Sequence, residues 1–169
     1  DKFLEKIQYK DIEVLFLQES SNRQDLYNGK ALNSVSVKKQ NQQIKKVIFN
    51  HSYFQANSDT NYDNSLSIQT PPYRLKLDNI EIFNGSTLRP EKYIFEYDES
   101  INLPRRYSYS QDAWGFYNGK QNYSLIPRTD LYSIYNIHGI VGDADRSVSL
   151  DHSTANVLKK IYYPTGGGV

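Results

Sequence analysis

Short stretches of alternating apolar and polar residues recur along this chain, and that alternation is typical of β-strands with one buried face. Residues 11–19 carry apolar side chains on both faces of an extended segment, so we expect a central strand there. Residues 35–39 and 44–54 alternate more regularly and are joined by the polar residues 40–43. Together these two segments predict a first β-hairpin.

A second hairpin is predicted after residues 55–70, a polar stretch rich in Asn, Ser and Asp that we expect to lie on the surface. The strands of this hairpin are residues 73–83 and 92–98, and an Asn-Gly turn signal follows the first strand. We expect the leucine side chains of the first strand, Leu75 and Leu77, to face the aromatic side chains of the second.

The C-terminal part of the chain predicts one helix and one strand. Residues 150–158 carry apolar side chains at helical spacing, and Ser149 or Asp151 can cap the start of the helix. Residues 159–163 then form a short strand. In the long connection before the helix, residues 128–146, two glycines argue against a further helix.

These elements predict a mainly β fold, an antiparallel sheet or sandwich-like module with hairpins and one short helix near the C-terminus. The length fits a single β-rich module, residues 1–169. Within it, residues 1–70 hold the N-terminal hairpins and the polar loop, and residues 71–169 hold most of the sequence motifs. Because the chain starts at Asp1 and contains no methionine, we expect it to be a fragment of a longer chain.

Charge and composition narrow the classes of partner. The chain has 20 Lys and Arg against 19 Asp and Glu residues, and neither sign forms a block, so we expect no nucleic-acid binding. No stretch approaches the about 20 apolar residues of a membrane-spanning helix, so we expect no such segment. Cysteine is absent, which excludes disulfides and thiolate metal sites. The abundance of Tyr, Asn and Ser is common in extracytoplasmic proteins, so we expect a secreted or surface protein.

The segment with the most distinctive chemistry is residues 107–120, where aromatic rings alternate with polar and glycine residues. Rings can cover the apolar faces of sugars while amides and carboxylates bind hydroxyl groups, so this segment is the candidate ligand-binding site. The candidate residues are Tyr109, Asp112, Trp114, Phe116, Tyr117 and Asn118. The competing interpretation, favoured by the usual role of large aromatic residues, is that Trp114, Phe116 and Tyr109 fill the end of a β-core.

The evidence for a metal site is weak, and we expect neither a metal nor a cofactor. Asp143 and Asp145 alternate in a loop, as the carboxylates of calcium loops do. However, no acidic residue follows at the spacing that completes an EF-hand, and Arg146 can pair with either carboxylate, which favours a salt-bridged turn. The histidines, His51, His138 and His152, are scattered and do not have the spacing of a zinc site.

No catalytic motif stands out. The chain has no Gly-x-Ser-x-Gly elbow, and spacing alone does not assemble a Ser-His-Asp triad. Carboxylate pairs for glycoside hydrolysis can be drawn from Glu96, Asp112, Asp143 and Asp145, although any chain of this size offers such pairs. We therefore do not expect an enzyme, and a carbohydrate-active enzyme remains an alternative.

Four motifs follow one another in the second half of the chain: SQDAWGFYNGK at residues 110–120, SLIP at 124–127, ADR at 144–146 and LKKIYYPTGG at 158–167. In this order, and with the preceding hairpin, they resemble a region of uncharacterised secreted or surface proteins of Bacteroides-type bacteria, some of which carry Rhs/YD repeats. The resemblance covers about residues 73–167. It implies a location at the surface of a Gram-negative bacterium, and it supplies no activity, cofactor or catalytic residue.

Together these observations predict a non-enzymatic structural or adhesion/binding module of a bacterial secreted or surface protein. Its expected partners are a glycan or protein ligand, or flanking domains of the parent chain. The alternative is a carbohydrate-active enzyme or its accessory carbohydrate-binding domain.

Overall fold

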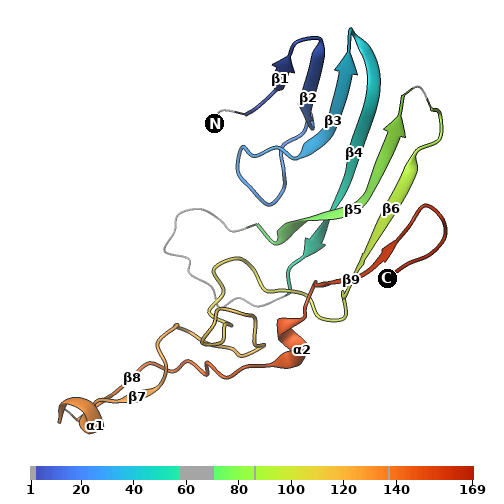
Figure 1. Ribbon diagram of the computed structural model, residues 1–169. Coiled ribbons are helices and arrows are strands. Elements are labelled where there is room, and N and C mark those ends of the chain that lie inside the picture. Colours follow the sequence, from blue (N-terminus) through green and yellow to red (C-terminus); the bar gives the residue numbers. More distant parts are fainter. Residues whose placement is uncertain (1–2, 58–70, 86, 137) are drawn as a thin grey trace. The chain divides into compact units, whose positions relative to one another are not determined.

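The computed structural model describes residues 3–57, 71–85, 87–136 and 138–169, and most of its regular structure is one antiparallel β-sheet (Figure 1). The sheet has seven strands in the order β1 (Lys6–Tyr9), β2 (Ile12–Gln18), β3 (Leu32–Lys39), β4 (Gln42–Gln55), β5 (Tyr73–Asn84), β6 (Glu91–Tyr97) and β9 (Leu158–Tyr162). A separate two-stranded ladder joins β7 (Thr129–Asp130) to β8 (Ile140–Val141). The prediction of a mainly β fold with an antiparallel sheet and hairpins is therefore confirmed.

Each predicted hairpin is present. Strands β3 and β4 pair antiparallel through the two-residue turn of Gln40 and Asn41, both of which have positive φ, at +49° and +64°. Two consecutive positive φ angles are the mark of a type I′ turn, whose twist matches that of the flanking strands. Strand β2 pairs with β1 on one side and β3 on the other, so it lies inside the sheet, although next to the edge strand and not at the middle.

The second hairpin, β5–β6, has a register that differs from the expected one. Tyr93 lies opposite Ile80, and the paired residues of β5 run only from Asn79 to Ile82. Leu75 and Leu77 precede this ladder, so the isoleucine end of β5 meets the aromatic strand. On its other side β6 pairs with β9, which is drawn in red beside it in Figure 1 and confirms the predicted C-terminal strand.

The helices differ from the prediction in length and number. Helix α2 (Leu150–Ser153) is present near the C-terminus but ends well before residue 158. A second helix, α1 (Leu131–Tyr135), lies in the connection where no further helix was expected. The carboxylate of Asp130 accepts a hydrogen bond from the Tyr132 amide and caps its start, and Asn136 in the left-handed conformation ends it. Neither helix is long enough to cross a membrane, and the described residues contain no other helix.

The chain divides into two compact units that do not follow the order of the sequence. The first unit comprises Asp1–Tyr53, Leu75–Tyr97 and Leu158–Val169 and holds almost all of the seven-stranded sheet. The second unit comprises Phe54–Arg74 and Asp98–Val157 and holds both helices and the β7–β8 ladder. From residue 58 on, the predicted surface excursion of residues 55–70 lies outside the described residues.

The second unit has an interior rich in polar side chains. Its buried polar residues are Ser108, Ser110, Asp112, Asn118 and Asn122, and its buried apolar residues among those described are Phe54, Pro104, Ala144 and Ala155. Buried polar groups are costly unless they are hydrogen-bonded, so the folding of this unit depends on how completely these groups are paired.

Candidate functional site

The candidate ligand-binding residues lie in the second unit, on a tight loop closed by a bridge between Gln111 and Tyr117 or, for Tyr109 and Asn118, just outside that bridge. Within this bridge the Asp112 amide donates to the Phe116 carbonyl over 2.8 Å. Gly115 takes a positive φ of +93°, a conformation that side chains with a Cβ rarely adopt, and allows the chain to reverse there. The loop therefore has a defined shape despite belonging to no strand or helix.

Asp112 organises this loop from the inside. Its carboxylate Oδ1 accepts hydrogen bonds from the Trp114 amide at 2.8 Å and the Phe116 amide at 2.9 Å. Its carbonyl oxygen accepts two further bonds from the Arg146 guanidinium, through Nε and Nη2. With 3% of its surface exposed, Asp112 is occupied in holding the loop, which makes it a supporting residue of the candidate site.

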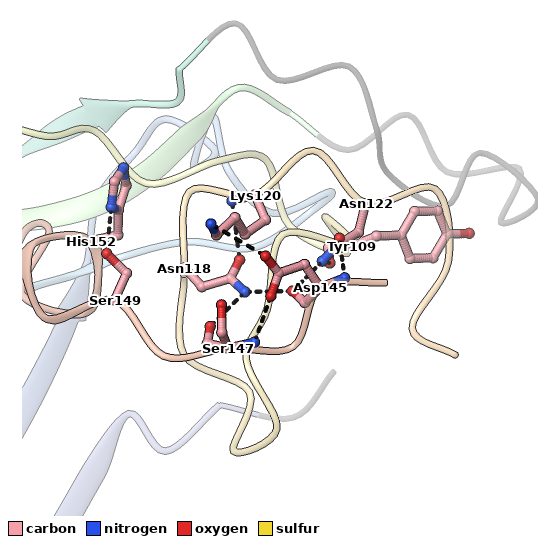
Figure 2. Close-up of polar contacts among 8 residues, drawn as sticks. All are labelled: Tyr109, Asn118, Lys120, Asn122, Asp145, Ser147, Ser149 and His152. Carbon is pink, nitrogen blue, oxygen red and sulfur yellow. Dashed lines mark hydrogen bonds and ion pairs between the residues drawn. The ribbon is translucent and has the colours of Figure 1, made fainter. Parts of the chain in front are cut away.

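Two asparagine side chains fasten this part of the unit together (Figure 2). Asn118, 1% exposed, donates to the carbonyl oxygens of Asp145 and Ser147 at 2.9 and 3.0 Å, and its own oxygen accepts from the Lys120 amide. Asn122, 2% exposed, donates to the carbonyls of Tyr109 and Asp145 and accepts from the Asp145 amide. Each asparagine thus bridges chain segments far apart in sequence, so Asn118 also belongs to the framework.

The loop of Asp143 and Asp145 makes contacts different from the expected ones. Arg146 pairs with neither carboxylate, because its guanidinium donates to the carbonyl oxygens of Asp112 and Leu125. Asp145 instead accepts from the Ser147 amide at 3.0 Å and lies 3.2 Å from the Lys120 ammonium. Hydrogen bonding to Ser147, followed by Lys120, lowers the pKa of Asp145 from 3.8 to about 2.

Asp143 has a separate partner, since its carboxylate accepts a hydrogen bond from the Ser124 hydroxyl at 2.9 Å. Across the residues that the structure describes, no three His, Cys, Asp or Glu side chains form a group that could hold a metal ion. Both carboxylates therefore take part in hydrogen bonds or ion pairs within the chain.

Trp114 and Phe116 project from the loop into solvent. Their exposed fractions are 81% and 59%, so the interpretation that they fill the end of a β-core is wrong for both rings. Tyr109 is half-buried, as is Tyr117, whose hydroxyl accepts a hydrogen bond from Asn57 at 2.9 Å. The structure thus divides the six candidate residues into exposed rings, half-buried rings and buried polar supports.

A groove of about 230 Å³ lies beside the loop, within the second unit. Three rings line it, those of Tyr107, Phe116 and Tyr117, together with Arg74 and Arg105. Tyr107 and the two arginines were not among the residues predicted to bind a ligand. Tyr107 stood in the aromatic segment and was available to it, whereas nothing in the sequence connects Arg74, at the start of β5, with a loop some 40 residues further on.

His152 supports the loop from helix α2. Its ring lies edge-on to Tyr117, with ring centroids 5.2 Å apart, and packs directly against Gly119. Ser149 stands at the start of α2 as predicted, but its hydroxyl makes a 2.8 Å hydrogen bond with His152 Nδ1 and does not cap the helix (Figure 2). This pair fixes the histidine ring against the Asn118-Gly119 turn.

The carboxylates considered for glycoside hydrolysis are dispersed over other contacts. Asp112, Asp143 and Asp145 have the partners described above, and Glu96 in the first unit accepts a hydrogen bond from the Tyr162 hydroxyl. None of the four lines the groove beside Phe116 or a second, larger groove of about 890 Å³ on the sheet of the first unit.

No protein-family model matches this chain, and neither a curated protein nor a solved structure matches it.

Proposed function

We propose that this chain is a non-enzymatic binding module of a secreted or surface protein of a Gram-negative bacterium. Its contact surface is the loop of residues 112–116 with the groove beside it, and its ligand is a glycan. The observation that carries the proposal is the exposure of Trp114, at 81%, on a loop whose backbone amides are hydrogen-bonded to the carboxylate of the buried Asp112. The cellular location rests on the resemblance of the four sequence motifs.

Exposed tryptophan on a rigid loop is unusual, because tryptophan is among the side chains that gain most from burial. In this loop the buried carboxylate of Asp112 accepts hydrogen bonds from the backbone amides of Trp114 and Phe116. These bonds fix the backbone of both residues while their rings stay exposed. Ordering a surface before a ligand arrives lowers the entropy lost on binding. The arrangement is therefore better suited to recognition than to stability.

The neighbouring groups favour a sugar as the ligand. Flat rings can stack on the C–H face of a sugar, and the hydroxyl and amide groups in the groove, including those of Ser153 and Gln111, can bind sugar hydroxyls. The four carboxylates considered for glycoside hydrolysis do not line this groove, so we propose that the groove binds a sugar without hydrolysing it.

The first experiment is a glycan-array and bacterial-polysaccharide binding screen of the chain and its Trp114→Ala variant. Because the Trp114 ring is mostly in solvent, we expect the variant to keep its circular dichroism spectrum and melting temperature. We expect its affinity for any glycan found to fall about tenfold or more, the size of effect seen at aromatic hot spots.

The matched control is Tyr27→Ala, which removes an equally exposed ring, 85% exposed, from the first unit. We expect this variant to bind as the parent chain does. Equal binding by Trp114→Ala and the parent chain would show that the loop is not the contact surface. The absence of binding to any glycan would overturn the proposal itself.

A further inference from the structure

The groove beside Phe116 combines rings with positive charge. Arg74 and Arg105 both line it, and none of its described lining residues is Asp or Glu. Arginine keeps its charge at any physiological pH. The described lining of the groove thus combines aromatic side chains with the positive charge of two arginines.

The arginines are held in place by the protein itself. Arg74 Nη2 donates to the carbonyl oxygen of Pro104 at 3.0 Å, and both arginines make further contacts within the chain. A guanidinium has five N–H donors in a fixed plane, so an anchored arginine can still offer donors or its charge to a ligand. An anchored side chain is already ordered, so it loses less conformational entropy when a ligand binds than a mobile side chain does.

The size of the groove limits the ligand. A volume of about 230 Å³ is below the range of about 300–1,000 Å³ that is usual for pockets of drug-sized ligands. The groove therefore has room for one ring, with the remainder of a longer ligand outside it. An extended peptide is less suited to such a site, because peptides usually bind along a sheet edge or a long groove.

Resting on the proposed function, we propose that this groove binds a single carboxylate-bearing sugar residue of a glycan, such as a uronic or sialic acid. The sugar ring contacts the aromatic side chains of Tyr107, Phe116 and Tyr117, and the carboxylate is attracted by Arg74 and Arg105. A planar guanidinium matches a carboxylate in shape as well as in charge, so the acid group sets the specificity.

The test compares uronate- and sialate-containing oligosaccharides with their carboxyl-reduced counterparts, which keep the sugar ring and lose the charge. We expect each acidic oligosaccharide that binds to do so at least about tenfold more tightly than its reduced form, as for charge-assisted hydrogen bonds. We expect this preference to shrink with added salt, because salt screens exposed charges.

The variant Arg105→Gln locates the effect. We expect it to lose the preference for acidic over reduced sugars while its affinity for the reduced forms stays unchanged. Arg128→Gln, which removes an exposed charge that does not line the groove, serves as the control and should keep the preference. If both Arg105→Gln and a folded Arg74→Gln variant keep the preference for acidic sugars, the assignment of the carboxylate to these arginines is contradicted.

Each result separates this inference from the proposed function. Equal binding of acidic and reduced sugars would refute the inference and leave a glycan-binding module. If the chain binds only an Asp- and Glu-rich peptide in the same assay, both the acidic-sugar inference and the proposal that the ligand is a glycan are refuted. The absence of any binding would refute both proposals together.

Discussion

Gly119 and Gly85 share a backbone conformation but differ in their surroundings. Their φ angles are +69° and +58°, and both follow an asparagine in a turn. A Cβ on Gly85 would meet nothing within 4 Å, whereas a Cβ on Gly119 would overlap the ring of His152. The pair therefore separates the cost of the conformation from the cost of close packing.

We expect Gly85→Ala to lower the free energy of unfolding by about 1 kcal/mol, the usual cost of placing a side chain in this conformation. We expect Gly119→Ala to lower it by about 2–4 kcal/mol, because overpacking against His152 adds to that cost. Urea unfolding of both variants measures the difference.

A double variant controls for the clash. In a His152→Ala background the Gly119→Ala substitution should cost only about as much as Gly85→Ala, since the overlapping ring is absent. An unchanged cost in that background would mean that His152 does not limit the space at Gly119.

Asp145 makes the stability of the chain depend on pH at the acidic end. Its pKa is about 2 in the folded protein against 3.8 for an ordinary aspartate, because the folded state stabilises the ionised form. The contribution of Asp145 is therefore complete above about pH 5 and is lost as the pH falls through 2.

Other carboxylates titrate over the same range, so the test compares the parent chain with Asp145→Asn. We expect the difference between their free energies of unfolding to be constant above about pH 5 and to shrink steadily towards pH 2. Urea unfolding at a series of pH values measures it. Two curves that stay parallel down to pH 2 would show that the Ser147 and Lys120 contacts do not act on Asp145.

At the scale of single residues, the sequence singled out an aromatic and polar segment but did not separate its exposed rings from its buried polar supports. Asp112 and Asn118 were expected to contact a ligand because they stand among aromatic residues. An irregular loop cannot pair its backbone groups with a neighbouring strand, so it needs buried side chains to do so. Asp112 and Asn118 meet that need, and Trp114 is left in solvent.

At the scale of elements, the strands were predictable because alternation and turn signals are local properties of the sequence. Their partners were less predictable, as shown by the Ile80–Tyr93 register and by β9, which pairs with a strand some 60 residues before it. Helix α1 is only five residues long, and periodicity cannot reveal so short a helix. Its capping residues, Asp130 and Asn136, were the available signal.

The β3–β4 turn offers a direct test of this local encoding. Gln40 and Asn41 both have positive φ, yet the sequence best suited to a type I′ turn is Asn-Gly. We expect the double substitution Gln40→Asn with Asn41→Gly to raise the free energy of unfolding by about 0.5–1 kcal/mol, because it relieves backbone strain. Urea unfolding measures the gain.

The control for this change is Gln43→Asn, a substitution of the same type inside the paired strand. Asparagine is unfavourable in strands, so we expect this variant to be neutral or less stable. A loss of stability in the turn variant would contradict the type I′ assignment.

At the scale of the whole molecule, the chain passes between its two units four times, so neither unit is a continuous stretch of sequence. From the sequence we predicted one module, with hairpins and a polar loop in residues 1–70 and most of the motifs in residues 71–169. Spatial grouping depends on long-range pairing, such as that of β6 with β9, which composition does not record.

The variant Asn118→Ala tests how far the two units depend on each other. It leaves the Ser147 carbonyl oxygen and the Lys120 amide without this partner and removes one of the two donors to the Asp145 carbonyl, so we expect a loss of about 1–3 kcal/mol of stability. All of these contacts lie in the second unit. We therefore expect hydrogen exchange of backbone amides to accelerate there, for example at Trp114 and Phe116, while β2 and β3 stay protected.

The exposed neighbour Gln121 provides the control, since Gln121→Ala should leave exchange unchanged throughout the chain. If Asn118→Ala accelerates exchange in β2 and β3 as much as in the loop, the two units unfold together and the network around Asn118 stabilises the entire chain. If only the second unit responds, the loop that carries Trp114 can open while the sheet remains folded, and ligand binding should then protect the loop amides selectively.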